Sequence, residues 1–212
     1  LIILFPRRAA GRIDLGAKIR NVASSSNFTL TGATPVVNVL SPNAIINQAI
    51  TLVNNAGDVN LESGTYEQSV LIKNKDVNLK KSATAPAGSV TIAANTLDAN
   101  NQFQNFYDAV INDAVVLVQN GLVNINDIIV SGANVTGTAA GHRVVAIGLD
   151  NASANINNAT AKGAAVGVVA QASNIQGDAA RNVTINGSTV SEFSQFGIEA
   201  TGDLLAADIG GT

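Results

Sequence analysis

The stretch VNIND at residues 123–127 recurs as ANINN at 154–158 and as VTING at 183–187. Its central isoleucine therefore returns after 31 and then 29 residues. Each copy alternates apolar and polar residues, as in a strand with one buried face, and ends on Asp, Asn or Gly, which favour turns. Short strands at a long, nearly constant period indicate a solenoid, in which each repeat buries its apolar side by stacking on its neighbours.

A second apolar run precedes each copy, at 115–118, 144–149 and 166–170, and a further run at 196–200 begins the next turn. Residues 128–130 are typical of a third strand in the same turn. We therefore expect an all-β, right-handed parallel β-helix of about six turns. Asn is common at the ends of the runs, where it tolerates the left-handed conformation, and stacked Asn side chains are expected to form ladders.

The composition suits a narrow solenoid core. Hydrophobic residues make up 46% of the chain but aromatic residues only 4%, so the core must consist of Val, Ile, Leu and Ala. No apolar stretch approaches the roughly 20 residues that span a membrane, and we predict no membrane span. Charged residues are only 13% and Cys is absent. With many Asn, Ser and Thr, this composition is typical of an extracellular or cell-surface protein.

Charge divides the chain into a basic arm, residues 1–20, and an acidic body, residues 21–212. The arm has five basic residues and one acidic residue (+4), and the body has seven basic and fourteen acidic residues (−7), which together give the net charge of −3. A basic arm of this kind is typical of segments that bind nucleic acid, anionic lipid or another copy of the chain. No aromatic residue interleaves with its arginines, so we expect no nucleic-acid partner. We predict that 21–212 forms the β-helix domain.

One helix is expected near the N-terminus of the body, at about residues 42–56. Ser41 is a favourable N-cap and Pro42 suits the first helical position. Apolar residues then recur at helical spacing as far as Val53, and Gly57 is a common stop signal. A single amphipathic helix in an all-β chain is expected to cap the open end of the solenoid.

The helix opens a longer motif, IINQAITLVNNAGDVNLESGTYEQSVLIKNKDVNL, at residues 45–79. It resembles the start of right-handed parallel β-helix proteins of the pectate-lyase-like superfamily. The register departs from the family by one position, because Glu67 follows Tyr66 directly whereas the family pattern often has one residue between them. The resemblance extends more loosely to residue 209. It implies the same fold, and we expect a non-catalytic, surface or fibre-forming member.

The catalytic motifs of related enzymes are incomplete here. Polygalacturonases of this superfamily use a Gly-His motif together with paired aspartates and a downstream Arg-x-Lys. His142, within residues 141–143, matches the first motif, but the sequence has no Asp-Asp pair and no Arg-x-Lys. We therefore predict that His142 is a loop residue at a corner of the solenoid.

Pectate lyases of similar fold need clustered acidic Ca²⁺ ligands and an arginine base. In this chain that alternative would bring together Asp127, Asp150 and Asp178, with Arg143 and Arg181 nearby. Aspartates near turns more commonly solvate corners. We predict no enzymatic activity, no metal and no cofactor.

An aromatic cluster interrupts the strand pattern between residues 98 and 114, where Phe103, Phe106 and Tyr107 lie close in sequence. We predict a loop or short helix packed on the outside of the solenoid. A platform on which sugar rings stack is the alternative.

Two features at the ends of the chain indicate assembly. The apolar run at residues 1–5 has high strand propensity and needs a partner, while the turn at 196–209 has two predicted strands where earlier turns have three. We expect a structural subunit whose N-terminal strand completes the C-terminal coil of the next copy, by strand complementation in a head-to-tail polymer. The alternatives are pairing of residues 1–5 within their own chain, and a surface adhesin or a β-helix that binds or degrades polysaccharides, with surface glycans as partners. The predicted subunit interface comprises Leu1, Ile2, Ile3, Leu4, Phe5, Arg7, Arg8, Arg12, Leu204, Leu205 and Ile209.

Overall fold

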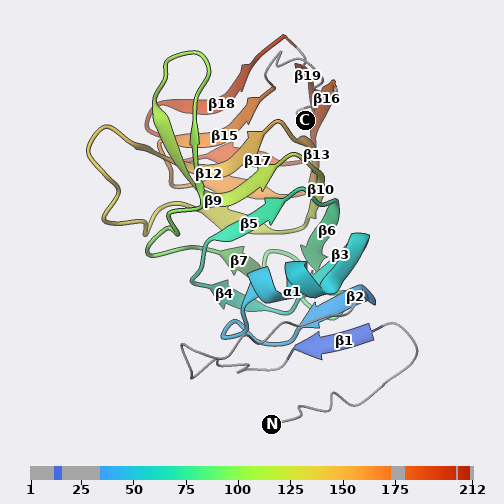
Figure 1. Cartoon of the computed structure of the whole chain (residues 1–212). Coiled ribbons are helices and arrows are strands. Elements are labelled where there is room, and N and C mark those ends of the chain that lie inside the picture. Colours follow the sequence, from blue (N-terminus) through green and yellow to red (C-terminus); the bar gives the residue numbers. More distant parts are fainter. Residues whose placement is uncertain (1–11, 16–33, 173–179, 204, 211–212) are drawn as a thin grey trace, which may run out of the picture.

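The computed structural model describes residues 12–15, 34–172, 180–203 and 205–210, which form three parallel sheets and one short helix (Figure 1). Sheet A consists, in spatial order, of β1 (Arg12–Leu15), β2 (Thr34–Val39), β3 (Val53–Leu61), β6 (Val77–Lys81), β10 (Leu122–Asn126), β13 (Ser153–Asn157), β16 (Arg181–Asn186) and β19 (Leu205–Gly210). Sheet B consists of β4 (Gly64–Tyr66), β7 (Val90–Ile92), β11 (Ile129–Ser131), β14 (Thr160–Lys162) and β17 (Thr189–Ser191). Sheet C consists of β5 (Val70–Lys73), β9 (Ile111–Gln119), β12 (Arg143–Asp150), β15 (Val166–Gln171) and β18 (Phe196–Thr201), and β8 (Gln102–Gln104) pairs antiparallel with β9.

From β3 onward the chain visits sheets A, B and C in turn and then returns to A one strand further along. This is the predicted all-β, right-handed parallel β-helix. The repeat found in the sequence sets its register, because Ile125 pairs with Ile156 and Ile156 with Ile185. Identical side chains therefore stack at each level, and all three are almost completely buried.

Asn, Asp and Gly form the corners, as the sequence predicts. Asn120 and Asn151 adopt φ of 54° and 48° between sheets C and A. Asp127, Asn158 and Gly187 adopt φ of 58°, 50° and 57° between sheets A and B. These are left-handed conformations, which Asn, Asp and Gly adopt at least cost. The same corner is thus made at successive levels by residues that allow it.

The predicted Asn ladder runs along the strands of sheet A. Asn78 donates a side-chain hydrogen bond to Asp58 (2.8 Å), Asn124 to Asn78 (2.6 Å) and Asn155 to Asn124 (2.7 Å). Each amide thus donates to one neighbouring strand, and the oxygens of Asn78 and Asn124 accept from the other. The ladder satisfies half-buried polar groups and links four successive strands.

The helix α1 (Ile46–Leu52) is shorter than the predicted 42–56. Ser41 does not cap it, because its hydroxyl accepts the N–H of Asn43 (3.2 Å) in a separate turn. The N–H of Ile46 instead donates to the side-chain oxygen of Gln68 (2.8 Å), which comes from the adjacent coil. The helix ends before Gly57, since Val53 is already extended and enters β3.

The helix covers the N-terminal end of the solenoid core, as predicted. Its buried residues Ile46, Ala49 and Ile50 join the same apolar cluster as the sheet interiors. Lys75 closes its C-terminal end by donating to the carbonyl of Ile50 (2.6 Å), where a cation also complements the helix dipole. Burial lowers the pKa of this lysine.

Candidate functional site

A hairpin covers the outer face of sheet C. It consists of β8, a turn at residues 105–110 and β9, and it rises across β12, β15 and β18 (Figure 1). Phe103 anchors it in a second apolar cluster on that face, together with Val145 and Val169. The ring requires a glycine beneath it, because a Cβ on Gly148 would lie 2.5 Å from the ring. The aromatic segment is thus packed outside the solenoid, as predicted. Phe106 and Tyr107 lie in the predicted loop, whereas Phe103 lies in a strand.

Hydrogen bonds hold the hairpin to successive coils. At its base, the side chain of Asn101 donates to the carbonyl of Val70 in β5 (2.8 Å). Further along, Gln171 in β15 donates to the carbonyl of Gln104 (2.9 Å) and accepts the N–H of Phe106 (3.1 Å). The Gln171 side chain thereby forms hydrogen bonds with the hairpin backbone that a neighbouring strand would otherwise form.

Arg143 lies at the centre of a buried polar network beneath the hairpin, with 6% of its surface exposed. Its Nε donates to Asn112 (2.9 Å), and its Nη1 lies 3.0 Å from Glu199 and 3.4 Å from Asp108. Asn105 at the hairpin turn also donates to Glu199. Arg143 in β12 is therefore linked to β9, to β18 and to the hairpin turn, and it faces two carboxylates.

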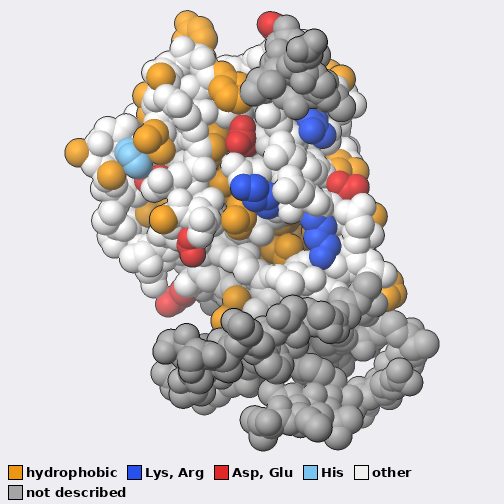
Figure 2. All heavy atoms as spheres, in the orientation of Figure 1, with side chains coloured by type: hydrophobic (Ala, Val, Ile, Leu, Met, Phe, Trp, Pro, Cys, Tyr) orange, Lys and Arg blue, Asp and Glu red, His pale blue; other side chains and the backbone are white. Residues whose placement is uncertain are grey.

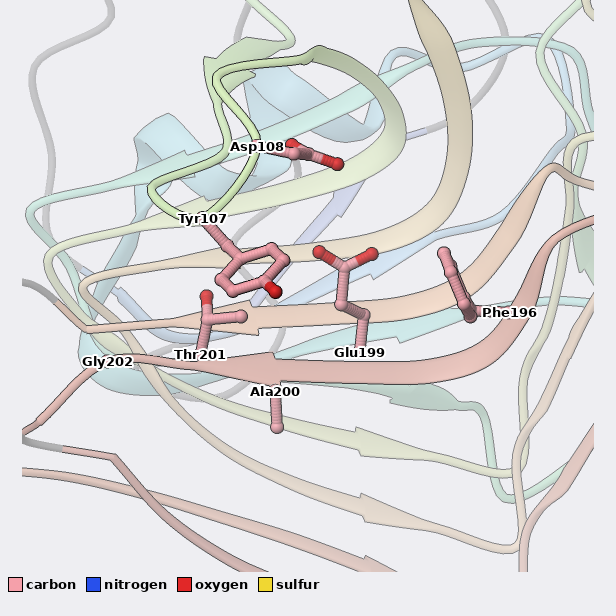
Figure 3. A pocket seen from close by; sticks show the side chains of 7 residues that line it. All are labelled: Tyr107, Asp108, Phe196, Glu199, Ala200, Thr201 and Gly202. Atoms are coloured by element: carbon pink, nitrogen blue, oxygen red, sulfur yellow. The ribbon is translucent and has the colours of Figure 1, made fainter.

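A pocket of about 460 Å³ opens beside this network (Figure 3). Its side chains come from the hairpin turn and from β18. In Figure 3, Phe196, Glu199 and Thr201 point from β18 toward Tyr107 and Asp108, whereas Ala200 points to the opposite side. The residues that line the pocket are Tyr107, Asp108, Phe196, Glu199, Ala200, Thr201 and Gly202.

The pocket combines aromatic surface with hydrogen-bond acceptors. Tyr107 is 86% exposed and Phe196 is 52% exposed, so both rings are available to a ligand. The carboxylate of Glu199 accepts hydrogen bonds from Arg143, and that of Asp108 lies 3.4 Å from the Arg143 guanidinium; both retain further acceptor capacity. This lining suits a ligand with hydroxyl groups and a flat apolar face.

His142 lies in the connection before β12, in agreement with the predicted loop position. Its Nδ1 lies 3.0 Å from the carboxylate of Asp113, which is 2% exposed. A carboxylate on Nδ1 orients the ring and leaves Nε2 as the second functional nitrogen. No local sequence pattern predicts this pair, because Asp113 lies 29 residues earlier and is brought close only by stacking.

The structure separates the aspartates of the alternative lyase site. Asp127 follows β10 at the corner to sheet B, whereas Asp150 ends β12 at the corner to sheet A, where it accepts from Gln119 and Gln171. Arg143 pairs instead with Glu199 and Asp108, and Asp178 lies outside the described residues. That grouping is therefore wrong for Asp127, Asp150 and Arg143. Over the part of the chain that the structure describes, no group of three or more His, Asp or Glu residues is arranged to hold a metal ion.

Three residues of the predicted interface lie at opposite ends of sheet A. Arg12 begins β1, at one edge, and Leu205 and Ile209 lie in β19, at the other. Ile209 is 51% exposed. Within the described ranges, β1 pairs only with β2, and β19 only with β16. The remaining predicted interface residues fall outside those ranges, namely Leu1, Ile2, Ile3, Leu4, Phe5, Arg7, Arg8 and Leu204.

The surface in Figure 2 carries few charged side chains, which are scattered among polar groups. No helix within the described ranges has the length and apolar character needed to cross a membrane.

No protein-family model matches the sequence, and no curated protein and no solved structure matches it significantly.

Proposed function

We propose that the protein is a structural subunit of an extracellular fibre or surface appendage, which assembles head to tail through the ends of its solenoid. The observation that carries the proposal is the unequal length of the sheets. Among the described residues sheet A has eight strands, and its β1 and β2 precede the first complete coil while β19 follows the last strand of sheet C. Within the described ranges, sheet A therefore extends beyond sheets B and C at both ends.

An extended parallel edge is a template for another chain, because its outer N–H and C=O groups need partners. The two edges of sheet A have the same strand direction, so translating one copy along the solenoid axis brings unlike edges together. Such a contact joins two different surfaces and does not close, so it propagates into a filament.

Apolar exposure at the two ends supports the same assembly. Phe193, Phe196 and Ile209 are exposed at the C-terminal end, and Leu40 and Ile45 are exposed beside β2 and α1 at the N-terminal end. Stacking of copies would bury these side chains, and burial of apolar area is the main favourable term in association. The predicted donor strand, residues 1–5, would add a further strand at this junction.

The test is negative-stain electron microscopy of the purified chain at several concentrations. We expect uniform thin filaments whose number rises with concentration. Discrete short rods at every concentration would contradict the proposal. Deletion of residues 1–8 then tests the donor strand separately, since filaments that persist in the truncated chain exclude this segment as the connector.

A second candidate function, carbohydrate binding, is favoured by the pocket between the hairpin and β18. Tyr107 and Phe196 offer ring faces for sugar stacking, and Asp108 and Glu199 offer acceptors for hydroxyl groups. The test is a binding screen against neutral and acidic polysaccharides, in which the bound polysaccharides are also assayed for cleavage. Tyr107→Ala should abolish binding and Tyr107→Phe should retain it, whereas equal binding by both variants would exclude this site.

A further inference from the structure

Strand register defines a mainly polar column across sheet A, which we call the Arg12–Asp208 column. Consecutive residues of the column are direct partners on neighbouring strands. It begins in β1, passes through the Asn ladder and ends in β19. In order it consists of Arg12, Val36, Asp58, Asn78, Asn124, Asn155, Thr184 and Asp208, so it is polar except at Val36. A basic residue therefore occupies one end of the column and an acidic residue the other.

The adjacent column of the same sheet is apolar. Ile13 pairs with Val37 at one end, Ile185 pairs with Ile209 at the other, and the residues between them belong to the core. Both columns thus end in residues that match their opposite ends: basic with acidic, and isoleucine with isoleucine.

We propose that β19 of one copy pairs in parallel with β1 of the next copy, with Asp208 opposite Arg12 and Ile209 opposite Ile13. The occupant of each sheet edge is a second copy of this chain, and the inference rests on the head-to-tail function proposed above. Within one copy the column already joins strands by side-chain contacts, since Asn78 donates to Asp58 (2.8 Å). The junction between copies would place a basic and an acidic residue at the same register position of adjacent strands.

Charge distinguishes this register from its alternatives. A shift of one residue places Arg12 in a column of core residues, where an unpaired charge is strongly unfavourable. A shift of two residues in one direction keeps apolar residues together but sets Asp14 opposite Asp208, and like charges directly opposite destabilise a strand pair. A shift of two in the other direction sets Arg12 opposite Gly210, at the end of β19.

Disulfide trapping tests the register, because the chain has no Cys. Partners on adjacent strands lie about 4.8 Å apart, within the Cα range for a disulfide. Oxidised Ile13→Cys/Ile209→Cys should give a ladder of multimers on a non-reducing gel. Ile13→Cys/Ile185→Cys is the matched control, since Ile185 lies one strand further along the same column, at about 10 Å, and should remain monomeric. Leu15→Cys/Ile209→Cys tests the register shifted by two residues. In that register Leu15 lies opposite Ile209, and Asp14 lies opposite Asp208.

A ladder only with the first pair supports the proposal, and a ladder only with the Leu15 pair overturns it. If filaments form but neither pair is trapped, the register is overturned while head-to-tail assembly stands. If the wild-type chain forms no filaments and no pair is trapped, both proposals fail.

Charge reversal gives an independent test in the full chain. Asp208→Arg should raise the concentration needed for assembly by about tenfold, because it sets two cations opposite each other. Arg12→Asp/Asp208→Arg should restore assembly. Asp203→Arg, which makes the same charge change outside the column, should leave it unchanged. Improved assembly of Asp208→Arg alone would overturn the register, because it would indicate that Asp14 faces this position.

Discussion

β15 and β18 are neighbours in sheet C and have similar apolar sequences, but they differ completely in burial. All six residues of β15 are buried, whereas none of the residues of β18 is. The two strands pair in register, with Val168 opposite Ile198 and Ala170 opposite Ala200. Two features differ. β15 is stacked between β12 and β18 while β18 pairs only with β15 among the described residues, and the outer face of β15 is covered by Phe103 of the hairpin, which packs on Val169.

The comparison shows that an apolar strand of a solenoid is not buried by its own coil. Burial comes from the coils above and below and, on the outer face of sheet C, from the hairpin, so stability is expected to rise from the terminal coil to the interior. The N-terminal end differs again, since α1 covers it and Tyr66 in the first coil is fully buried.

The largest effect is expected from Ile125→Ala in an interior coil. Ile125 is fully buried between Leu79 and Ile156, and its truncation should lower the free energy of unfolding by about 3–4 kcal/mol. Ile209→Ala, in the same column but half exposed, should cost the monomer less than about 1 kcal/mol. Urea unfolding of both variants under non-assembling conditions measures the two losses in the free energy of unfolding. Equal losses would contradict a gradient of stability from the terminal coil to the interior.

Arg143 is expected to hold the terminal coil to the interior. Arg143→Met leaves Glu199, which is 14% exposed, without its cation and should lower the free energy of unfolding by about 2–3 kcal/mol. Hydrogen exchange should show lost protection in β18 and in the hairpin turn, with little change in β15.

The control is Lys80→Met, which removes an ion pair with Asp58 that is about a third exposed on both sides. We expect a change of less than about 1 kcal/mol. If β18 keeps its protection in Arg143→Met, the apolar contacts of β18 suffice to hold it.

The capped N-terminal coil is expected to show an alkaline transition. Burial, the nearby charge of Glu62 and a hydrogen bond to the Glu62 carbonyl act on the Tyr66 hydroxyl, and burial as the largest cause raises its pKa to about 12. Between pH 10 and 12 the unfolded chain releases this proton while the folded chain retains it, so stability falls by about 2 kcal/mol over that range.

Tyr66→Phe should abolish this part of the pH dependence, and also lower stability at neutral pH by about 1 kcal/mol through loss of the hydroxyl contacts. The measurement is urea unfolding at pH 9 to 12 for both proteins. If the free energies of unfolding of the two proteins change in parallel between pH 9 and 12, ionisation of the Tyr66 hydroxyl does not contribute to the pH dependence of stability.

The smallest effect concerns the Asn ladder. Asn124→Ala removes bonds to Asn78 and Asn155 and should cost about 1–2 kcal/mol. Asn186→Ala, at an exposed position of β16, should change stability by less than about 0.5 kcal/mol. Thermal unfolding of the two variants compares them directly, and a larger loss for Asn186→Ala would reverse the proposed gradient.

The solenoid and its corners could be predicted from the sequence because their signals are local. The spacing of Ile125, Ile156 and Ile185 predicts the stacking, and residues such as Asn158 tolerate the corner conformation whatever their neighbours are. The helix was predicted in the right place but with the wrong ends, because its first N–H is satisfied by Gln68 from the next coil and not by Ser41.

The candidate site depends on contacts that no local pattern encodes. Arg143 reaches Glu199 56 residues later, and Asn105 reaches it across 94 residues. Both contacts require the order of strands in sheet C and the path of the hairpin over it. Periodicity and turn chemistry act within one coil and so can be recognised in the sequence, whereas the partners of long polar side chains depend on which coils the stacking brings together.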